Sequence, residues 1–142
     1  PVVGIRCTIN DGAFHAVDSS EMAFKTAALQ GFREAYVGAK PIILEPIMKV
    51  EIEAPVEFQG SVVGQVNQRR GIIQDTISAD VVTVTALVPL NAMFGYSTDL
   101  RSATQGKGQF TMEFAKYAPV PRQEQDEMVK KYKEQLALEA KK

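Results

Sequence analysis

Apolar and polar residues alternate over the first ten positions of the chain. The apolar members occupy every second position, which is the repeat of a strand with one buried face. These members are Val3, Ile5, Cys7 and Ile9. On such a strand the thiol of Cys7 is expected to be buried and inert. Turn-forming residues follow at 10–12, so the pattern predicts an exposed loop over residues 11–17.

The spacing changes to that of a helix after this loop. Asp18 and Glu21 match a capping box, in which each side chain bonds a backbone N–H of the first turn. A helix is therefore predicted to begin near Ser19. Its apolar positions are Phe24, Ala27, Ala28, Phe32 and Ala35. Gly38 suits a left-handed C-cap ahead of Pro41, where the helix must stop.

A second alternation begins after Pro46 and predicts a half-buried strand. Its inward residues are Met48, Val50 and Ile52. An amphipathic helix is predicted after Pro55, because apolar residues recur there at helical spacing. This stripe consists of Phe58, Val62, Val63 and Val66. Gly71 is placed to cap the end of that helix.

Three more elements complete this region. β-branched runs at 72–74 and 81–88 predict an antiparallel hairpin. A helix is predicted over 91–102, with Met93, Phe94, Ser97 and Leu100 on one side. The glycines around Lys107 then turn the chain into a last strand. The inward residues of that strand are Phe110, Met112 and Phe114.

The order strand, helix, strand, strand, helix, strand predicts an α+β fold. It is the ferredoxin-like split βαβ arrangement, with helices on one face of an antiparallel sheet. Many unrelated activities use this fold, so the fold alone does not indicate a function. Residues 122–142 are rich in helix formers and predict a C-terminal helix after Pro119 and Pro121. Its only apolar stripe is Met128, Tyr132 and Leu136, which predicts weak docking and a frayed end.

Composition and charge narrow the classes of function. The 142 residues carry a net charge of −1 and a sequence pI of 5.9, which gives no support to strong non-specific binding of nucleic acid. Any RNA contact must be local. Cys7 and His15 are the only cysteine and histidine, which excludes a disulfide framework and a multi-ligand zinc site. No apolar run reaches the roughly 20 residues of a membrane helix, and no signal peptide opens the chain.

His15 most invites a chemical role. A general base needs a pocket and a partner, and the neighbouring loop residues supply neither. Two interpretations stay open: a contact residue on a protruding loop, where Phe14 and His15 stack on bases, and plain solvent exposure. Ser19 and Ser20 beside Asp18 are explained by helix capping rather than by a nucleophile.

Arg69 and Arg70 end the helix predicted after Pro55. A cap that compensates the helix dipole and a contact to an RNA phosphate both stay open for this pair. The glycine pairs at 60 and 64 and at 106 and 108 lack the context of a phosphate-binding loop. No catalytic residue, bound cofactor or metal is therefore expected within this chain.

Four segments together carry a resemblance to a known family. They are residues 11–25 (DGAFHAVDSSEMAFK), 44–51 (LEPIMKVE), 68–71 (QRRG) and 89–102 (PLNAMFGYSTDLRS). In order and spacing they resemble the C-terminal part of the elongation factor G family of translational GTPases. The first resembles the tip loop and following helix of domain IV, and the others resemble domain V.

The resemblance implies a domain organisation. Residues 1–44 would be the C-terminal half of a domain IV-like unit (strand, loop, helix, strand), 45–118 a domain V-like ferredoxin fold, and 119–142 a C-terminal helix or tail. In the family, more strands and a second tip loop precede Pro1, so the domain IV sheet would be incomplete and the chain a fragment. GTP and Mg would bind in the N-terminal domain outside this chain. The chain alone would not be an enzyme, whereas its parent would be a GTPase.

By the same resemblance, the parent binds the ribosome and promotes GTP-dependent translocation of tRNA and mRNA. The loop that would touch tRNA and mRNA at the decoding site consists of Asp11, Gly12, Ala13, Phe14, His15, Ala16 and Val17. Arg69 and Arg70 would contact ribosomal RNA, and ribosomal proteins are further expected partners. Segments 54–60, 94–98 and 105–108 resemble the mitochondrial branch, which implies the mitochondrial matrix, with a bacterial cytoplasm as the alternative.

Two other functions stay open. One is a paralogue that splits ribosomes after termination and is built on the same domains. The other is an unrelated ferredoxin-like module that binds a small molecule.

Overall fold

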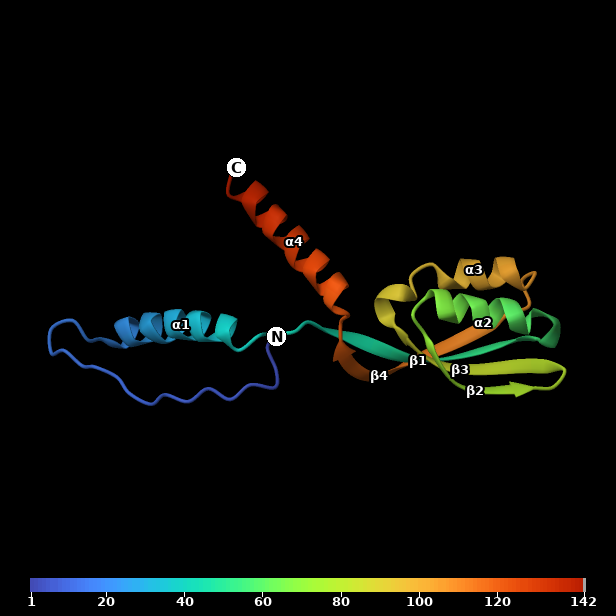
Figure 1. The fold of residues 1–142 in the computed structure, drawn as a ribbon, viewed down its shortest axis with the longest axis horizontal. Helices are drawn as coiled ribbons and strands as arrows, with labels where there is room; N and C mark the ends of the chain where they lie inside the picture. The colour runs from blue at the N-terminus through green and yellow to red at the C-terminus, as the bar shows by residue number, and fades with distance from the viewer. Residues whose placement is uncertain (142) are drawn as a thin grey trace. The chain divides into compact units, whose positions relative to one another are not determined.

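The computed structural model describes residues 1–141 of the chain. They fall into two compact units, Pro1–Pro41 and Ile42–Lys142, of which the second is described as far as Lys141. Figure 1 follows the chain from its blue N-terminus to its red C-terminus. Each unit is considered by itself.

The first unit contains a long loop and one helix, α1 (Glu21–Gly38). The strand predicted over residues 3–9 is absent. A strand is held by ladder hydrogen bonds to a neighbour, and within residues 1–141 the only sheet lies in the second unit. The alternating apolar side chains are exposed, from 51% for Ile5 to 84% for Ile9. Cys7 is likewise exposed, so the expected buried thiol is wrong.

The cap of α1 differs from the predicted capping box. Ser20, in an extended conformation, is the N-cap, and its Oγ accepts from the backbone N–H of Ala23 at 3.1 Å. Glu21 pairs instead with Lys25 one turn later, at 2.9 Å. Asp18 is left outside the helix. At the other end Lys40, with φ of 54°, takes the left-handed conformation that was predicted for Gly38.

The second unit is an α+β domain. Its strands are β1 (Leu44–Pro55), β2 (Ile72–Ser78), β3 (Val81–Pro89) and β4 (Gln109–Pro119), and its helices are α2 (Gln59–Gln68), α3 (Tyr96–Ala103) and α4 (Arg122–Glu139). Short 3-10 turns, η1 (Val56–Phe58) and η2 (Leu90–Ala92), lead into α2 and precede α3. The strands form one antiparallel sheet in the order β2-β3-β1-β4. The predicted order of elements and the predicted fold class are confirmed.

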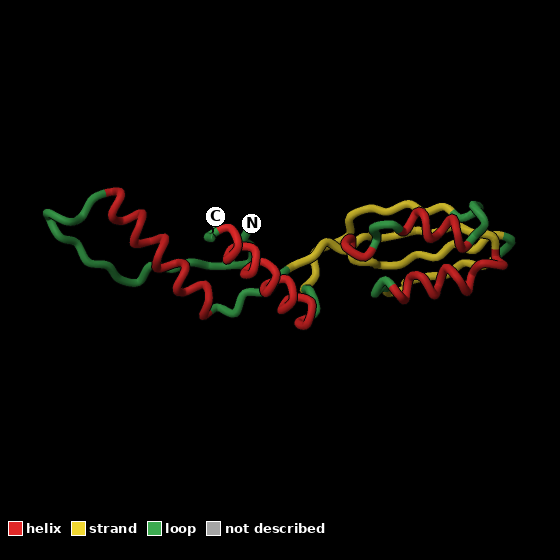
Figure 2. Tube along the Cα trace, turned by 90° about the horizontal axis from the view of Figure 1, so that it is seen from above, coloured by secondary structure: helices red, strands yellow, loops and turns green. Residues whose placement is uncertain are grey.

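Helices α2 and α3 cover one face of the sheet, as Figures 1 and 2 show. Between them and the sheet lies the core, whose strand residues are β-branched or small. It consists of Val50, Ile52, Ala54, Val62, Val66, Val82, Val84, Ala86, Val88, Met93, Tyr96 and Leu100. Of the residues predicted to face inward on β1, Val50 and Ile52 are fully buried and Met48 is partly buried.

Helix α3 begins later than predicted, at Tyr96, behind Gly95 with φ of 76°. Its buried residues are Tyr96 and Leu100, whereas Phe94 lies in the preceding loop with 74% of its surface exposed. Ser97 is also exposed. The predicted one-sided stripe is therefore wrong for Phe94, which precedes the helix and does not share its repeat, and for Ser97, which lies in α3 on its exposed side.

β4 is an edge strand, and this limits what it buries. Phe110 packs edge-on against Tyr96, with ring centroids 4.9 Å apart. Met112 and Phe114, predicted to face inward, are 45% and 53% exposed. The short helix α3 covers only the first part of this strand, so the alternation on β4 does not translate into burial.

α4 leaves the end of the sheet as a separate helix with no buried residue (Figure 2). Met128, Tyr132 and Leu136 keep 37% to 61% of their surface exposed, in agreement with the predicted weak docking. Two hydrogen bonds tie its start to Ile43: Val120 N–H donates to Ile43 O (2.9 Å), and Ile43 N–H donates to Gln125 Oε1 (3.1 Å). None of the described helices combines the length and apolar character needed to cross a membrane.

Candidate nucleic-acid interface

Residues 11–17, which the sequence predicts as an exposed contact loop, are all exposed. Gly12 has open space where a side chain would lie, and its N–H donates to Asp11 Oδ1 at 2.8 Å. Phe14 is 74% exposed, and its ring stacks on Phe24 of α1 with centroids 6.5 Å apart. The loop therefore presents an aromatic face that α1 supports from one side.

Ser19 closes the loop around His15. The backbone N–H of His15 donates to Ser19 Oγ at 2.7 Å, and the backbone N–H of Ser19 donates to His15 O at 2.9 Å. These two bonds form a ring that fixes the backbone just before α1. Ser19 thus has a structural part in the loop, whereas Ser20 caps the helix.

The His15 imidazole contacts two neighbours through one nitrogen. Nδ1 accepts a hydrogen bond from the Val17 backbone N–H at 3.3 Å, and Asp18 Oδ2 lies 3.3 Å from the same atom. The side chains of His15 and Asp18 are 67% and 81% exposed. An imidazole this exposed has no pocket around it, so the geometry offers a contact residue rather than a general base.

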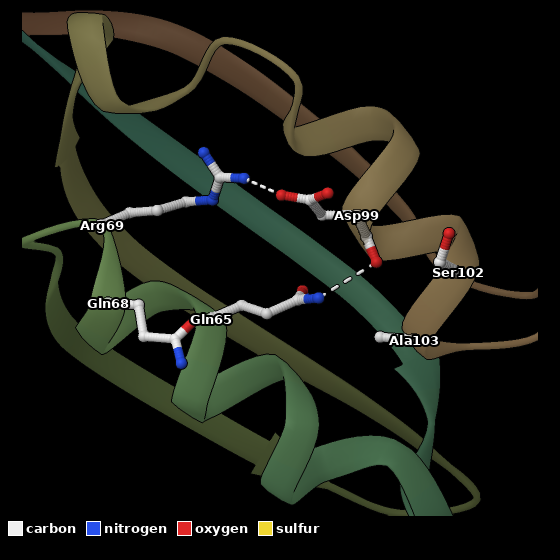
Figure 3. Close-up of a pocket in the computed structure, with 6 residues that line it drawn as sticks. All are labelled: Gln65, Gln68, Arg69, Asp99, Ser102 and Ala103. Atoms are coloured by element: carbon white, nitrogen blue, oxygen red, sulfur yellow. Dashed lines mark hydrogen bonds and ion pairs between the residues drawn. The ribbon is translucent and has the colours of Figure 1, made fainter.

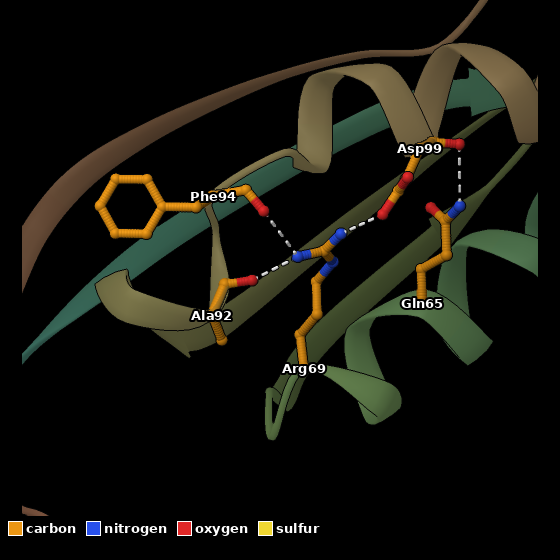
Figure 4. Close-up of polar contacts among 5 residues, drawn as sticks. All are labelled: Gln65, Arg69, Ala92, Phe94 and Asp99. Atoms are coloured by element: carbon orange, nitrogen blue, oxygen red, sulfur yellow. Dashed lines mark hydrogen bonds and ion pairs between the residues drawn. The ribbon is translucent and has the colours of Figure 1, made fainter. Parts of the chain in front are cut away.

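The guanidinium group of Arg69 is held inside the second unit (Figure 4). It donates to the backbone oxygens of Ala92 and Phe94 and to the carboxylate of Asp99. Its carbon Cζ lies 5.0 Å from the centroid of the Tyr96 ring. Only 17% of its side chain is exposed, and through these contacts Arg69 joins the end of α2 to α3 and the segment before it.

Arg70 has a different environment. Its guanidinium nitrogens lie 3.3 Å from the two carboxylate oxygens of Glu45, a buried residue of β1, and Nη2 lies 3.2 Å from Glu124 of α4. Arg70 also has φ of 60°, the left-handed conformation predicted for Gly71. One third of its side chain, 34%, is exposed. Of the two arginines, Arg70 offers more surface to a partner.

An open groove of about 600 Å³ lies between α2 and α3 (Figure 3). It is lined by Gln65, Gln68, Arg69, Asp99, Ser102 and Ala103. Gln65 Nε2 donates to Asp99 O at 3.0 Å, and within residues 1–141 Gln65 Oε1 finds no partner. Small-molecule sites enclose most of the surface of their ligand, so a groove this open does not favour that class of ligand.

Tyr96 lies beneath Arg69 and is 1% exposed. Burial raises the pKa of its hydroxyl to about 12, and the positive charge of Arg69 opposes that rise. Its oxygen has no hydrogen-bond partner among the described residues. The ring is therefore a packing element in this position.

The described residues offer little to a metal ion or nucleotide. Within residues 1–141, no three imidazole, thiol or carboxylate groups gather closely enough to hold a metal. Gly60 and Gly64 lie inside α2, and Gly106 and Gly108 lie in the turn before β4. Neither pair forms a strand-to-helix loop that could cradle a phosphate.

Sequence reasoning missed the partners of the two arginines. Asp99 and the carbonyls of Ala92 and Phe94 come from a different element than Arg69, and no local pattern joins them. A cationic partner of Glu45 could have been predicted, because a carboxylate at the start of a strand with one buried face needs a positively charged partner when it is buried. The part that Ser19 plays in the loop was also missed, since the capping pattern accounted for both serines.

Comparison with known proteins adds to this geometry. The sequence profile described as the C-terminus of elongation factor G matches residues 42–128, and the profile of elongation factor G domain IV matches residues 1–40. Elongation factor G 2 of Bdellovibrio bacteriovorus is 58% identical over 142 residues, covering 99% of this chain and 20% of that protein. Elongation factor G 1 of Treponema pallidum is 55% identical over 140 residues, covering 98% and 20%.

A solved structure is also similar. The crystal structure of a Thermus thermophilus protein has a TM-score of 0.72 and 36% sequence identity, over 85% of this chain and 18% of that one. The chain spans about a fifth of the length of the curated relatives named above. Those relatives are bacterial and lend no support to the predicted mitochondrial branch. Together the two profiles match residues 1–40 and 42–128, which is most of both units. The chain therefore belongs to the elongation factor G family.

Proposed function

We propose that this chain is the ribosome-binding C-terminal part of a GTPase that promotes translocation of tRNA and mRNA. The observation that carries the proposal is the coincidence of two facts. The family match extends through both units, and residues 11–17 form an exposed loop with an aromatic face and an exposed imidazole. The GTP and Mg that drive such a cycle would bind in another part of the parent polypeptide, in a bacterial cytoplasm.

The proposed mechanism is steric. The loop would occupy space beside tRNA and mRNA at the decoding site and so make backward movement of the tRNA costly. Two features support this part: the open backbone around Gly12 allows close approach to RNA, and Phe14 and His15 offer planar groups for stacking. The ring of hydrogen bonds between His15 and Ser19 and the stacking of Phe14 on Phe24 stiffen the loop. A loop that acts as a wedge must be stiff.

The two arginines differ in how readily each could bind ribosomal RNA. Arg70 keeps exposed surface beside its two carboxylate partners and could share a phosphate of ribosomal RNA. For Arg69, a phosphate would have to compete with Asp99 and two backbone oxygens. We therefore place the ribosomal RNA contact at Arg70 and assign Arg69 to the support of α3.

The experiment compares two activities of the full-length parent. One assay follows tRNA movement on pre-translocation ribosomes with GTP, and the other follows subunit splitting together with recycling factor. Translocation activity is expected. Splitting without translocation would assign the protein to the recycling paralogue instead, and absence of ribosome co-sedimentation at low salt would remove the proposal altogether.

A further inference from the structure

Helix α4 is attached to the second unit through its first turn. Among residues 122–139, Glu124 and Gln125 are half-buried and all the others are exposed. Gln125 Oε1 accepts the Ile43 N–H at 3.1 Å, and Glu124 Oε2 lies 3.2 Å from Arg70 Nη2. A helix that is held by two polar contacts at one end can swing about that end. The direction of α4 therefore depends on these two contacts.

Arg70 provides a fixed point for one of them. Its backbone N–H donates to Asn67 O at 3.2 Å, and the next N–H, that of Gly71, donates to Val66 O at 2.9 Å. Its two terminal nitrogens each lie 3.3 Å from an oxygen of the Glu45 carboxylate. Only 9% of the Glu45 side chain is exposed, and separating a buried ion pair is costly. The pair of Arg70 and Glu45 is therefore expected to persist.

Glu124 is the partner of Arg70 that can be exchanged. Its side chain is 35% exposed, and an ion pair that is open to water contributes little to stability. Glu124 also lies in the first turn of α4, where the helix dipole stabilises a carboxylate even when no arginine is near. Losing Arg70 therefore costs Glu124 little.

An RNA phosphate and Glu124 compete for the same place on Arg70. Nη2 already donates to Glu45, and the Glu124 carboxylate lies beside the same nitrogen. With both carboxylates in place the group of three side chains carries a net negative charge, which repels a phosphate. A phosphate that forms a charge-assisted bond to Arg70 must therefore take the place of Glu124.

We propose that Arg70 is a positioning residue that holds α4 in a fixed direction through Glu124, and that an RNA phosphate at Arg70 displaces Glu124 and releases the helix. The inference rests on the proposed function for the identity of the anion. The fixed direction of α4 depends only on contacts within the second unit. Because the two partners of Arg70 exclude each other, the coupling is reciprocal, and removing Glu124 strengthens the binding of RNA.

The first test measures the direction of α4 in the 142-residue chain, without ribosomes. Cys7→Ser removes the only native cysteine, and Ser61→Cys in α2 and Ala137→Cys in α4 place two spin labels at exposed positions. The distribution of distances between the labels is expected to be narrow in this labelled chain. It is expected to be at least about twofold broader when Glu124→Gln is added, because the helix then swings about its remaining contact. Equal widths would overturn the inference.

Glu127→Gln is the matched control. It removes the same charge from the next turn of α4, at an exposed position. The distance distribution is expected to stay narrow in this variant. Equal broadening by both substitutions would assign the effect to the charge of the helix and overturn the role of Arg70. Substitution of Arg70 itself is avoided, because it would leave the buried Glu45 without its partner.

The second test measures ribosome binding of the full-length parent. Glu124→Gln is expected to bind pre-translocation ribosomes about threefold more tightly than Glu127→Gln, because only the first removes the charge that competes for Arg70. Both variants have the same net charge, so equal affinities would overturn the displacement of Glu124 by RNA. Failure of the unsubstituted parent to bind ribosomes would contradict the proposed function instead, and the label distances decide the role of Arg70 in either case.

Discussion

The Arg69 guanidinium lies over the ring of Tyr96, with 5.0 Å between its carbon and the ring centroid. The same group bonds Asp99 and two backbone oxygens in the segment that leads into α3. One side chain at the end of α2 thus holds the start of α3 against the sheet. Arg69 therefore has a structural role, which distinguishes it from its neighbour Arg70.

Replacing Arg69 with Ala should lower the free energy of unfolding of the second unit by about 2–3 kcal/mol, because the change removes hydrogen bonds of a charged donor and leaves two carbonyls and a carboxylate without their partner. Urea denaturation of the whole chain measures this loss. Arg101→Ala is the control, since Arg101 is exposed near the end of α3, and it should change stability by less than about 0.5 kcal/mol. Equal losses in both variants would contradict the assigned role of Arg69.

Tyr96 should make the fold sensitive to alkali. Its pKa is about 12 in the fold and 10.0 in an exposed tyrosine, so between these values the unfolded chain releases the proton while the fold retains it. The stabilising contribution is complete below pH 10 and is lost as the pH rises toward 12, by about 2 kcal/mol. Stability against urea measured from about pH 9 to 12 gives the slope.

Tyr96→Phe is the matched variant for this slope. The hydroxyl has no hydrogen-bond partner among the described residues, so its removal should cost little at neutral pH. The variant should lose less stability than the parent chain between pH 10 and 12. Identical slopes for the two chains would rule out Tyr96 as the group responsible.

Position 71 requires glycine because Val66 leaves no room for a side chain there. A Cβ there would lie 2.5 Å from Val66 Cγ1 and 2.8 Å from the Val66 carbonyl oxygen. Gly71→Ala should therefore destabilise the second unit by about 1–3 kcal/mol. Gly64→Ala is the control of opposite sign: Gly64 lies in α2 with open space around it, and Ala should stabilise the helix by up to about 1 kcal/mol. Thermal unfolding of both variants checks the pair, and stabilisation by Gly71→Ala would be inconsistent with this packing.

The sequence predicted the second unit well because its signals are local. Alternation around Val50 and helical spacing around Val62 and Val66 depend only on nearby residues, and turn residues separate β2 from β3. Burial on β4 was harder to predict. Phe114 is exposed because its strand lies at the edge of the sheet and because α3 is short. Those are tertiary properties that no repeat encodes.

The first unit shows the opposite case. The alternation of Val3, Ile5 and Ile9 is that of a strand, but a strand needs a pairing partner, and no described residue supplies one. The exposure of the loop 11–17 was predictable from its turn residues. Which carboxylates pair with Arg69 and Arg70 was not, since Asp99, Glu45 and Glu124 lie far from them in sequence.

The most direct test of the account is the rate of tRNA movement driven by a full-length parent whose loop has been shortened. Residues 12–16 are replaced by two glycines, which leaves Ser19, Ser20 and α1 in place. The account predicts that a single round of translocation slows by at least about tenfold while ribosome binding and GTP hydrolysis persist. An unchanged rate with the shortened loop would contradict the claim that this loop acts by occupying space beside RNA.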